Sequence, residues 1–157
     1  MERRDFLTRS IGPGVVALAA ATGMPAAHAQ AANAAGWNKA AFDSKSLADA
    51  AKAMGATSAP VESKDLFLIA PEIAENGNVV RMEAKSAIAG TTQIAFVVEK
   101  NPSALAASFD IPAGTDANVK TNVKMGQSSN VYALAKAGDK FYYAVKEVKV
   151  TLGGCGG

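Results

Sequence analysis

Seven short runs of apolar or alternating residues, each followed by a turn signal, constrain the fold of this chain most strongly. In one of them Val80, Met82 and Ala84 alternate with charged residues, which is typical of a strand with one buried face. Glycine, proline, serine or aspartate mark the turns between runs. The runs are Leu66–Ala70, Val79–Ala87, Ile94–Glu99, Ala104–Ile111, Asn118–Met125, Asn130–Ala135 and Phe141–Leu152. They predict a mainly β protein, an immunoglobulin-like antiparallel β-sandwich.

The last run also predicts an irregularity. Val145 and Val148 are three positions apart, so they point to opposite faces of a regular strand. If both belong to one buried face, the strand needs an extra residue between them. We therefore expect a β-bulge near 146–147.

One helix is expected before the strands. Ser44 is suited to be its N-cap, the pattern continues to about Met54, and Gly55 is suited to end it. Leu47 and Met54 share one side of this helix, where they face either the core or a partner. The alanine-rich stretch 30–38 predicts a flexible start.

Residues 1–29 have the three parts of an export signal. Arg3–Arg4 precede an apolar pair, an uncharged stretch covers 11–24, and Ala27–Ala29 offers a cleavage site with small residues. The paired arginines fit the twin-arginine route. The apolar stretch is shorter than the roughly 20 residues that span a bilayer. We expect cleavage near Gln30 and a periplasmic protein.

The chain is thus predicted to contain four parts. They are a twin-arginine signal peptide at 1–29, an N-terminal segment with one helix at 30–62, a β-sandwich at 63–152, and a C-terminal arm at 153–157. Of 16 basic and 14 acidic residues, three and two lie in the signal, which leaves 13 and 12. These charges are scattered and nearly balanced, which argues against a nucleic-acid partner.

The scarcity of histidine and cysteine excludes most kinds of catalytic and metal-binding site. The chain's one histidine, His28, lies in the expected signal, so no histidine base or histidine metal ligand is expected in the mature protein. One cysteine cannot form a structural zinc site, an iron–sulfur cluster or an internal disulfide. Glycine-rich phosphate-binding motifs are missing too. We expect no enzyme, no metal and no cofactor.

The remaining chemical group is the thiol of Cys155. Gly153, Gly154, Gly156 and Gly157 surround it. Glycines without side chains leave the backbone slender and conformationally permissive, so the segment is unsuited to core packing. We predict that this arm presents the thiol to narrow pockets of other proteins.

Four features of the chain together resemble the SoxY family, the sulfur-carrying subunit of the bacterial thiosulfate-oxidising system. They are the twin-arginine start, the segment Pro71–Gly77, the dipeptide Asn101–Pro102 and the tail Gly153–Gly157, with Cys155 at its centre. The resemblance covers essentially the whole chain, and the tail is its most specific part.

The resemblance implies a role for Cys155 and a set of partners. Cys155 would be the covalent carrier of sulfur intermediates, and the flanking glycines its arm. A SoxZ-like subunit would bind the chain. A haem-containing enzyme would conjugate thiosulfate to the thiol, a metal-dependent thiosulfohydrolase would release sulfate, and a sulfane dehydrogenase, where present, would oxidise the remaining sulfur. No nucleic acid and no membrane would be involved.

Two alternatives from other classes stay open on the sequence. The first is a thiol-based redox protein, which needs a lowered thiol pKa or a resolving cysteine. The second is a periplasmic β-sandwich binding module whose tail links subunits through a disulfide. A sulfur adduct, an oxidised thiol and a simple dimer distinguish the three by intact mass.

Overall fold

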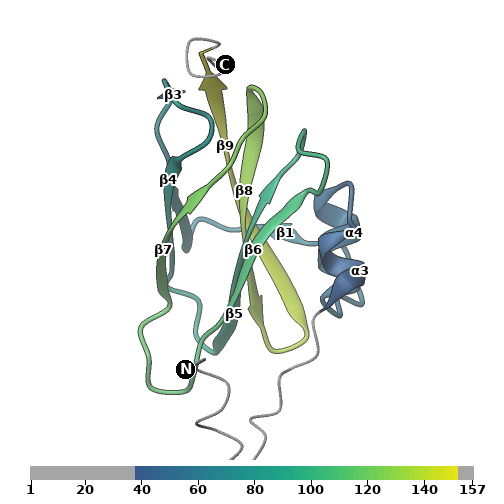
Figure 1. Cartoon of the computed structure of the whole chain (residues 1–157). Coiled ribbons are helices and arrows are strands. Elements are labelled where there is room, and N and C mark those ends of the chain that lie inside the picture. Colours follow the sequence, from purple (N-terminus) through teal and green to yellow (C-terminus); the bar gives the residue numbers. More distant parts are fainter. Residues whose placement is uncertain (1–37, 152–157) are drawn as a thin grey trace, which may run out of the picture. The chain divides into compact units, whose positions relative to one another are not determined.

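Two facing sheets make up most of the computed structural model, which describes residues 38–151 (Figure 1). The strands are β1 Val61–Glu62, β2 Leu66–Ile69, β3 Ile73–Ala74, β4 Val80–Ser86, β5 Thr91–Val98, β6 Leu105–Asp110, β7 Asn118–Val123, β8 Ser129–Ala137 and β9 Lys140–Val150. One sheet has the order β1-β9-β8-β5-β6, with β3 also pairing with β9, and the other has the order β2-β4-β7. The predicted β-sandwich is confirmed.

The main core lies between the sheets. Alternate residues of β4 point into it, and Val80, Met82 and Ala84 are each no more than 1% exposed, as their spacing predicts. Phe96 of β5 packs edge-to-face on Phe109 of β6, with 6.4 Å between the ring centroids. Burial of these large apolar groups is the principal force that holds the two sheets together.

Two short helices cover the outer face of the six-stranded sheet. α3 spans Lys39–Phe42 and α4 spans Leu47–Ala53, and both lie on one side of this sheet, opposite β4 and β7 (Figure 1). Ala50 and Ala51 are fully buried there, against a cluster that includes Leu134 and Phe141. Leu47 and Met54 pack against the same cluster, so they contact the chain's own sheet.

The side chains on both faces of strand β5 are buried. Ile94, Phe96 and Val98 belong to the core between the sheets, whereas Ala95 and Val97 belong to the cluster beneath the helices. All five are fully buried. Its unbroken apolar run therefore reflects a sheet that is buried on both sides.

The helical region differs in detail from the sequence expectation. The predicted helix is present as α4, but it begins later, because the side chain of Ser46, and not Ser44, accepts a hydrogen bond from the backbone N–H of Asp49 at 3.1 Å. Gly55 follows its end with φ +99°, a conformation that favours glycine. The sequence did not predict α3, which is one turn long and is capped by Asn38, whose side chain accepts from the backbone N–H of Ala41.

All seven predicted strands are present, and two additional ones are only two residues long. β1 and β3 both pair with β9 in parallel, at its beginning and at its end. Runs of two residues have no detectable periodicity, so the sequence could not predict them. The segment Pro71–Gly77, which carries part of the family resemblance, contains β3.

The predicted bulge near 146–147 is wrong. β8 and β9 pair without a register shift from Lys140 to Val148, so Val145 and Val148 point to opposite faces. Val148 is fully buried between the sheets, and Val145 is 42% exposed on the face that carries the helices. The irregularities lie in β5 instead, at Phe96/Val97 and at Thr91/Gln93.

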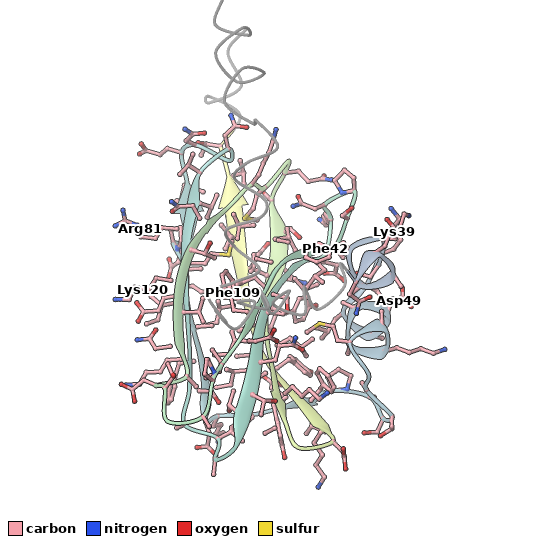
Figure 2. The ribbon with its side chains drawn as sticks, turned by 60° about the horizontal axis from the view of Figure 1, so that its bottom comes forward. Lys39, Phe42, Asp49, Arg81, Phe109 and Lys120 are labelled. Carbon is pink, nitrogen blue, oxygen red and sulfur yellow. The ribbon has the colours of Figure 1, made fainter. Side chains whose placement is uncertain are left out.

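The outer face of the three-stranded sheet carries no covering element among residues 38–151. The side chains that alternate with its buried residues are Phe67, Ile69, Arg81, Glu83, Lys85, Asn118, Lys120 and Asn122. Arg81 and Lys120 extend away from the sheets in Figure 2. In the described range, no helix has the length and apolar character that crossing a membrane requires.

A matched pair of substitutions in β9 tests this assignment of faces. Val148→Ala removes two buried methyl groups and leaves a cavity, so it should lower the free energy of unfolding by about 2 kcal/mol. Val145→Ala should change it by less than about 0.5 kcal/mol, because that side chain is already partly in water. Equal losses in denaturant titrations of the two variants would contradict the assignment.

Candidate functional site

The predicted site residues, Cys155 and Gly153, Gly154, Gly156 and Gly157, lie outside the described residues. The structure does describe the point from which this segment continues, which is Thr151 at the end of β9. We call the residues that surround this point the arm root: 72–77, 124–128 and 149–151. The arm root is the described part of the chain that borders the candidate site.

One side of the arm root is a pairing between β3 and the end of β9. Ile73 is in register with Lys149, and Ala74 with Val150 (Figure 1). The backbone N–H of Lys149 donates to the carbonyl of Glu72 at 2.9 Å, and that of Thr151 donates to Ala74 at 3.1 Å. The segment singled out in the sequence therefore lies directly beside the last described residues.

The opposite side of the arm root is held by a side chain. The backbone N–H of Val150 donates to the hydroxyl oxygen of Ser128 at 2.9 Å. The same hydroxyl lies 3.5 Å from the carbonyl oxygen of Val150, at the limit for a hydrogen bond. Ser128 is half-buried and directly precedes β8, so it extends the pairing with β9 by one residue.

Gly77 is the residue of the arm root that lies closest to Met125 and Val150. Its carbonyl accepts a hydrogen bond of 2.7 Å from the N–H of Met125, and the residue is buried. A Cβ atom at this position would lie 2.5 Å from the Met125 carbonyl oxygen and 2.9 Å from Cγ1 of Val150. Neither distance is compatible with a side chain, so glycine is required here by close approach of the backbone.

Asn101 joins the arm root to a second segment noted in the sequence. Its side-chain amide donates to the carbonyl of Lys124 at 2.7 Å, and its side-chain oxygen accepts from the N–H of Gly126 at 3.2 Å. These bonds hold the chain on both sides of Met125, which is 2% exposed. Two of the segments that carried the family resemblance, Pro71–Gly77 and Asn101–Pro102, therefore both bind residues 124–126.

The charges at the arm root are balanced. The carboxylates Glu72, Glu75 and Glu147 and the ammonium groups Lys124, Lys146 and Lys149 lie in or next to it. The Lys146 ammonium donates to the carbonyl of Ala70 at 2.7 Å. These groups are equal in number, three carboxylates and three ammonium groups. Among residues 38–151, no group of three or more His, Cys, Asp or Glu side chains is arranged to hold a metal ion.

Sequence reasoning identified part of this arrangement and missed part. Pro71–Gly77 and Asn101 were singled out, but the contact of the first with the last strand and of the second with Lys124 and Gly126 was not predicted. Ser128 and Met125 were not singled out at all, because a serine before a strand and an isolated methionine have no distinctive pattern. The Asn76–Gly77 dipeptide indicated a turn, whereas the close approach of Met125 and Val150 is a tertiary contact.

Comparisons with known proteins agree with the resemblance. The family model "Sulfur oxidation protein SoxY" matches residues 50–155. The solved structure of the sulfur carrier protein SoxY from Chlorobium limicola f thiosulfatophilum is 38% identical, with a TM-score of 0.58 over 66% of this chain and 96% of that chain. A search of curated proteins gave no match.

Two other solved structures are similar only at low level. A chain from the solved structure "Structural basis of T cell specificity and activation by the bacterial superantigen toxic shock syndrome toxin-1" is 14% identical, with a TM-score of 0.40 over 55% of this chain and 99% of that chain. The human F-spondin reeler domain is 10% identical, with a TM-score of 0.43 over 62% and 96%. Neither carries an argument about this chain.

Two glycines of the arm root allow a matched test of its packing. Gly77→Ala forces Met125 or Val150 to move, so it should lower the free energy of unfolding by about 1–3 kcal/mol. Gly126→Ala meets nothing closer than 4.0 Å and should change it by less than about 0.5 kcal/mol. Thermal unfolding of both variants measures the difference, and a neutral Gly77→Ala would disprove the close approach.

Proposed function

Since the chain belongs to the SoxY family of sulfur carrier proteins, we propose that it holds sulfur intermediates covalently on Cys155 while partner enzymes act on them. The observation that carries this proposal is the extent of the family match, which ends at Cys155, the chain's single cysteine. The described structure adds that the chain reaches this cysteine four residues after Thr151, which is hydrogen-bonded to the sandwich.

The proposed chemistry requires a thiol and access to it, and little else. The Cys155 thiol R–SH and thiosulfate form R–S–S–SO₃⁻ with the loss of one proton and two electrons, and a haem-containing enzyme accepts the electrons. A metal-dependent thiosulfohydrolase then uses water to release sulfate and a proton, which leaves R–S–SH on the cysteine. A sulfane dehydrogenase, where present, oxidises the remaining sulfur. In each step the catalytic groups belong to the partner.

The glycines on both sides of Cys155 support this role. A catalytic pocket that must exclude water is narrow, and a backbone without Cβ atoms enters it with the least steric hindrance. We propose that Gly153, Gly154, Gly156 and Gly157 form this arm. The chain itself is then not an enzyme, because its part in the reaction is to present the substrate.

We further propose that the protein acts in the periplasm. The paired arginines and the cleavage motif of residues 1–29 support export by the twin-arginine route. Cleavage would leave an N-terminal segment at 30–62, a sandwich at 63–152 and the arm at 153–157. The intact mass of the exported chain reports the cleavage site directly.

A SoxZ-like subunit is the proposed stable partner, and the outer face of the three-stranded sheet is its proposed binding surface. Phe67 and Ile69 of the edge strand β2 are 50% and 57% exposed on this face. Within residues 38–151, helices cover the outer face of the other sheet but nothing covers this one. Exposed aromatic and aliphatic side chains on one face are typical of protein interfaces.

The charges on this face indicate the character of the partner. Three cations, Arg81, Lys85 and Lys120, accompany one carboxylate, Glu83, which lies 3.4 Å from the Lys120 ammonium. Two copies of the chain would bring like charges together, which disfavours self-association through this face. A subunit with an apolar surface and acidic side chains around it would be complementary.

The alternative redox function is less well supported. A reactive thiol needs a lowered pKa, which comes from nearby cations, a helix N-terminus or a second cysteine. The described charges at the arm root are balanced, and the chain has no second cysteine. Disulfide linkage of two copies remains a distinct outcome of the test below.

The test of the proposed function compares the protein with its Cys155→Ser variant. After incubation with thiosulfate and the conjugating enzyme, intact mass spectrometry should show a thiosulfate-derived adduct on the wild type and none on the variant. The melting temperature should be unchanged within the equivalent of about 0.5 kcal/mol. Only a sulfenate or only a dimer on the wild type would favour a sensor or a linker and exclude the carrier.

A second pair of variants tests the binding surface. Ile69→Lys places a charge in the proposed interface and should weaken binding of the SoxZ-like subunit at least tenfold, which is about 1.4 kcal/mol. Val61→Lys is the control, because Val61 is 59% exposed on β1, in the other sheet. Titration calorimetry measures both affinities, and equal affinities would place the interface elsewhere.

A further inference from the structure

We infer that Ser128 and the Pro71–Gly77 segment anchor the last residues of β9 and so fix the pivot of the carrier arm at Thr151. Ser128 and Gly77 are then positioning residues for the transfer reactions of Cys155. This inference rests on the proposed function and adds to it the part of the fold that sets the arm's reach and direction.

The regular pairing of β8 with β9 ends before β9 does. β8 and β9 pair from Lys140 up to the pair Ser129 and Val148. Beyond Val148, the three successive backbone N–H groups of residues 149–151 have other partners, alternately on the two edges of the strand. The end of β9 is therefore held by a separate set of hydrogen bonds.

The β3 segment accepts two of these hydrogen bonds, and it contributes little to the core. Of its two residues, Ile73 is 59% exposed, and only the small Ala74 is buried. A strand whose purpose was burial would place the isoleucine inside. What β3 does supply is the pair of carbonyls, of Glu72 and Ala74, that accept from Lys149 and Thr151.

The side chain of Val150 lies close to Gly77. It packs partly against the main core, and Gly77 permits this close contact because it has no Cβ atom. Gly77 is itself fixed through the N–H of Met125, and Asn101 holds the chain around Met125. The contact of Gly77 with Val150 is thus backed by residues from two other parts of the sequence, Met125 and Asn101.

The consequence for the reaction follows from the length of the tether. With the pivot at Thr151, four residues reach to Cys155, a span of about 13 Å when extended. With the pivot at Val148, seven residues would reach to it, a span of about 23 Å. The effective concentration of a tethered group falls roughly as the −3/2 power of tether length. The longer tether therefore lowers the effective concentration of the thiol about twofold, before any loss of orientation is counted.

The experiment removes one hydroxyl at the arm root and one matched hydroxyl elsewhere. Ser128→Ala deletes the partner of the Val150 N–H. Ser86→Ala is the control. Ser86 is also half-buried, and its hydroxyl also accepts from a backbone N–H, that of Ile88 at 3.2 Å. Ser86 is the last residue of β4, whereas Gly77 precedes the first residue of that strand, so Ser86 lies at the end of β4 away from the arm root. Ser128→Thr keeps a hydroxyl and should behave as the wild type.

Two measurements are made on the full chain. A nitroxide attached to Cys155, the chain's single cysteine, reports motion of the arm by electron paramagnetic resonance. In separate samples, kcat/KM for enzymatic loading of Cys155 with thiosulfate is compared with the rate of alkylation by a small reagent. Ser128→Ala should increase nitroxide motion and lower kcat/KM by up to about twofold, with alkylation unchanged, because the bonds of Lys149 and Thr151 to β3 remain. Ser86→Ala should alter none of these.

An unchanged nitroxide spectrum in Ser128→Ala would overturn the anchor, and a changed spectrum with unchanged loading would overturn the positioning role. Loss of loading in Ser128→Thr equal to that in Ser128→Ala would also contradict it, because the hydroxyl would then be irrelevant. If the wild type took up no sulfur, the proposed function would fail, whereas the nitroxide result would still decide the anchor.

Discussion

Backbone pairing of β9 is the interaction on which the rest of the structure depends. β9 pairs with β8 over nine residues, with β1 at its beginning and with β3 at its end. Its side chains contribute to both apolar clusters, Val148 between the sheets and Phe141 beneath the helices. The last described strand is therefore held by three other strands and by both apolar clusters.

This arrangement separates the stability of the protein from its chemistry. The core contains apolar side chains, and in the described residues only Ser44 and Ser129 are buried polar ones. In the proposed function the reacting thiol is that of Cys155, four residues after Thr151, whose backbone N–H donates to Ala74. A carrier whose substrate must enter several different enzymes benefits from this separation, because changes at the thiol leave the packing of the core unaffected. In the proposed function, the fold supplies the pivot of the arm, and the partner enzymes supply the acids, bases and metals.

Much of the fold could be predicted from the sequence, and the errors have physical causes. The seven strands follow from period-two alternation or from short apolar runs. The bulge at 146–147 was wrong because one buried face was assumed, whereas β9 has apolar cover on both faces. Ser44 was a plausible helix cap by type, but the bond to Asp49 is made by Ser46. β1 and β3 escaped prediction because their pairing is set by tertiary contacts.

The thiol of the candidate site stays a prediction from the sequence, whereas the contacts of the arm root could not be predicted. Cysteine count and glycine content pointed to Cys155, since no other residue of the chain offers covalent chemistry of this kind. The sequence contains no signal that Gly77 contacts Val150 or that Ser128 accepts from its N–H, because both contacts join segments far apart in the chain. The comparisons identify the family, and the arm root gives a structural reason for the segments that carry the resemblance.

Carriage of sulfur on Cys155 in the exported protein is the central claim, and one measurement tests it most directly. The chain is purified from the periplasm of cells that are oxidising thiosulfate, without reducing agent, and its intact mass and its tryptic peptide 150–157 are determined. The account predicts a mature chain that begins near Gln30 and a thiosulfate-derived sulfur adduct on that peptide. An uncleaved chain, or an unmodified Cys155 during turnover, would contradict it.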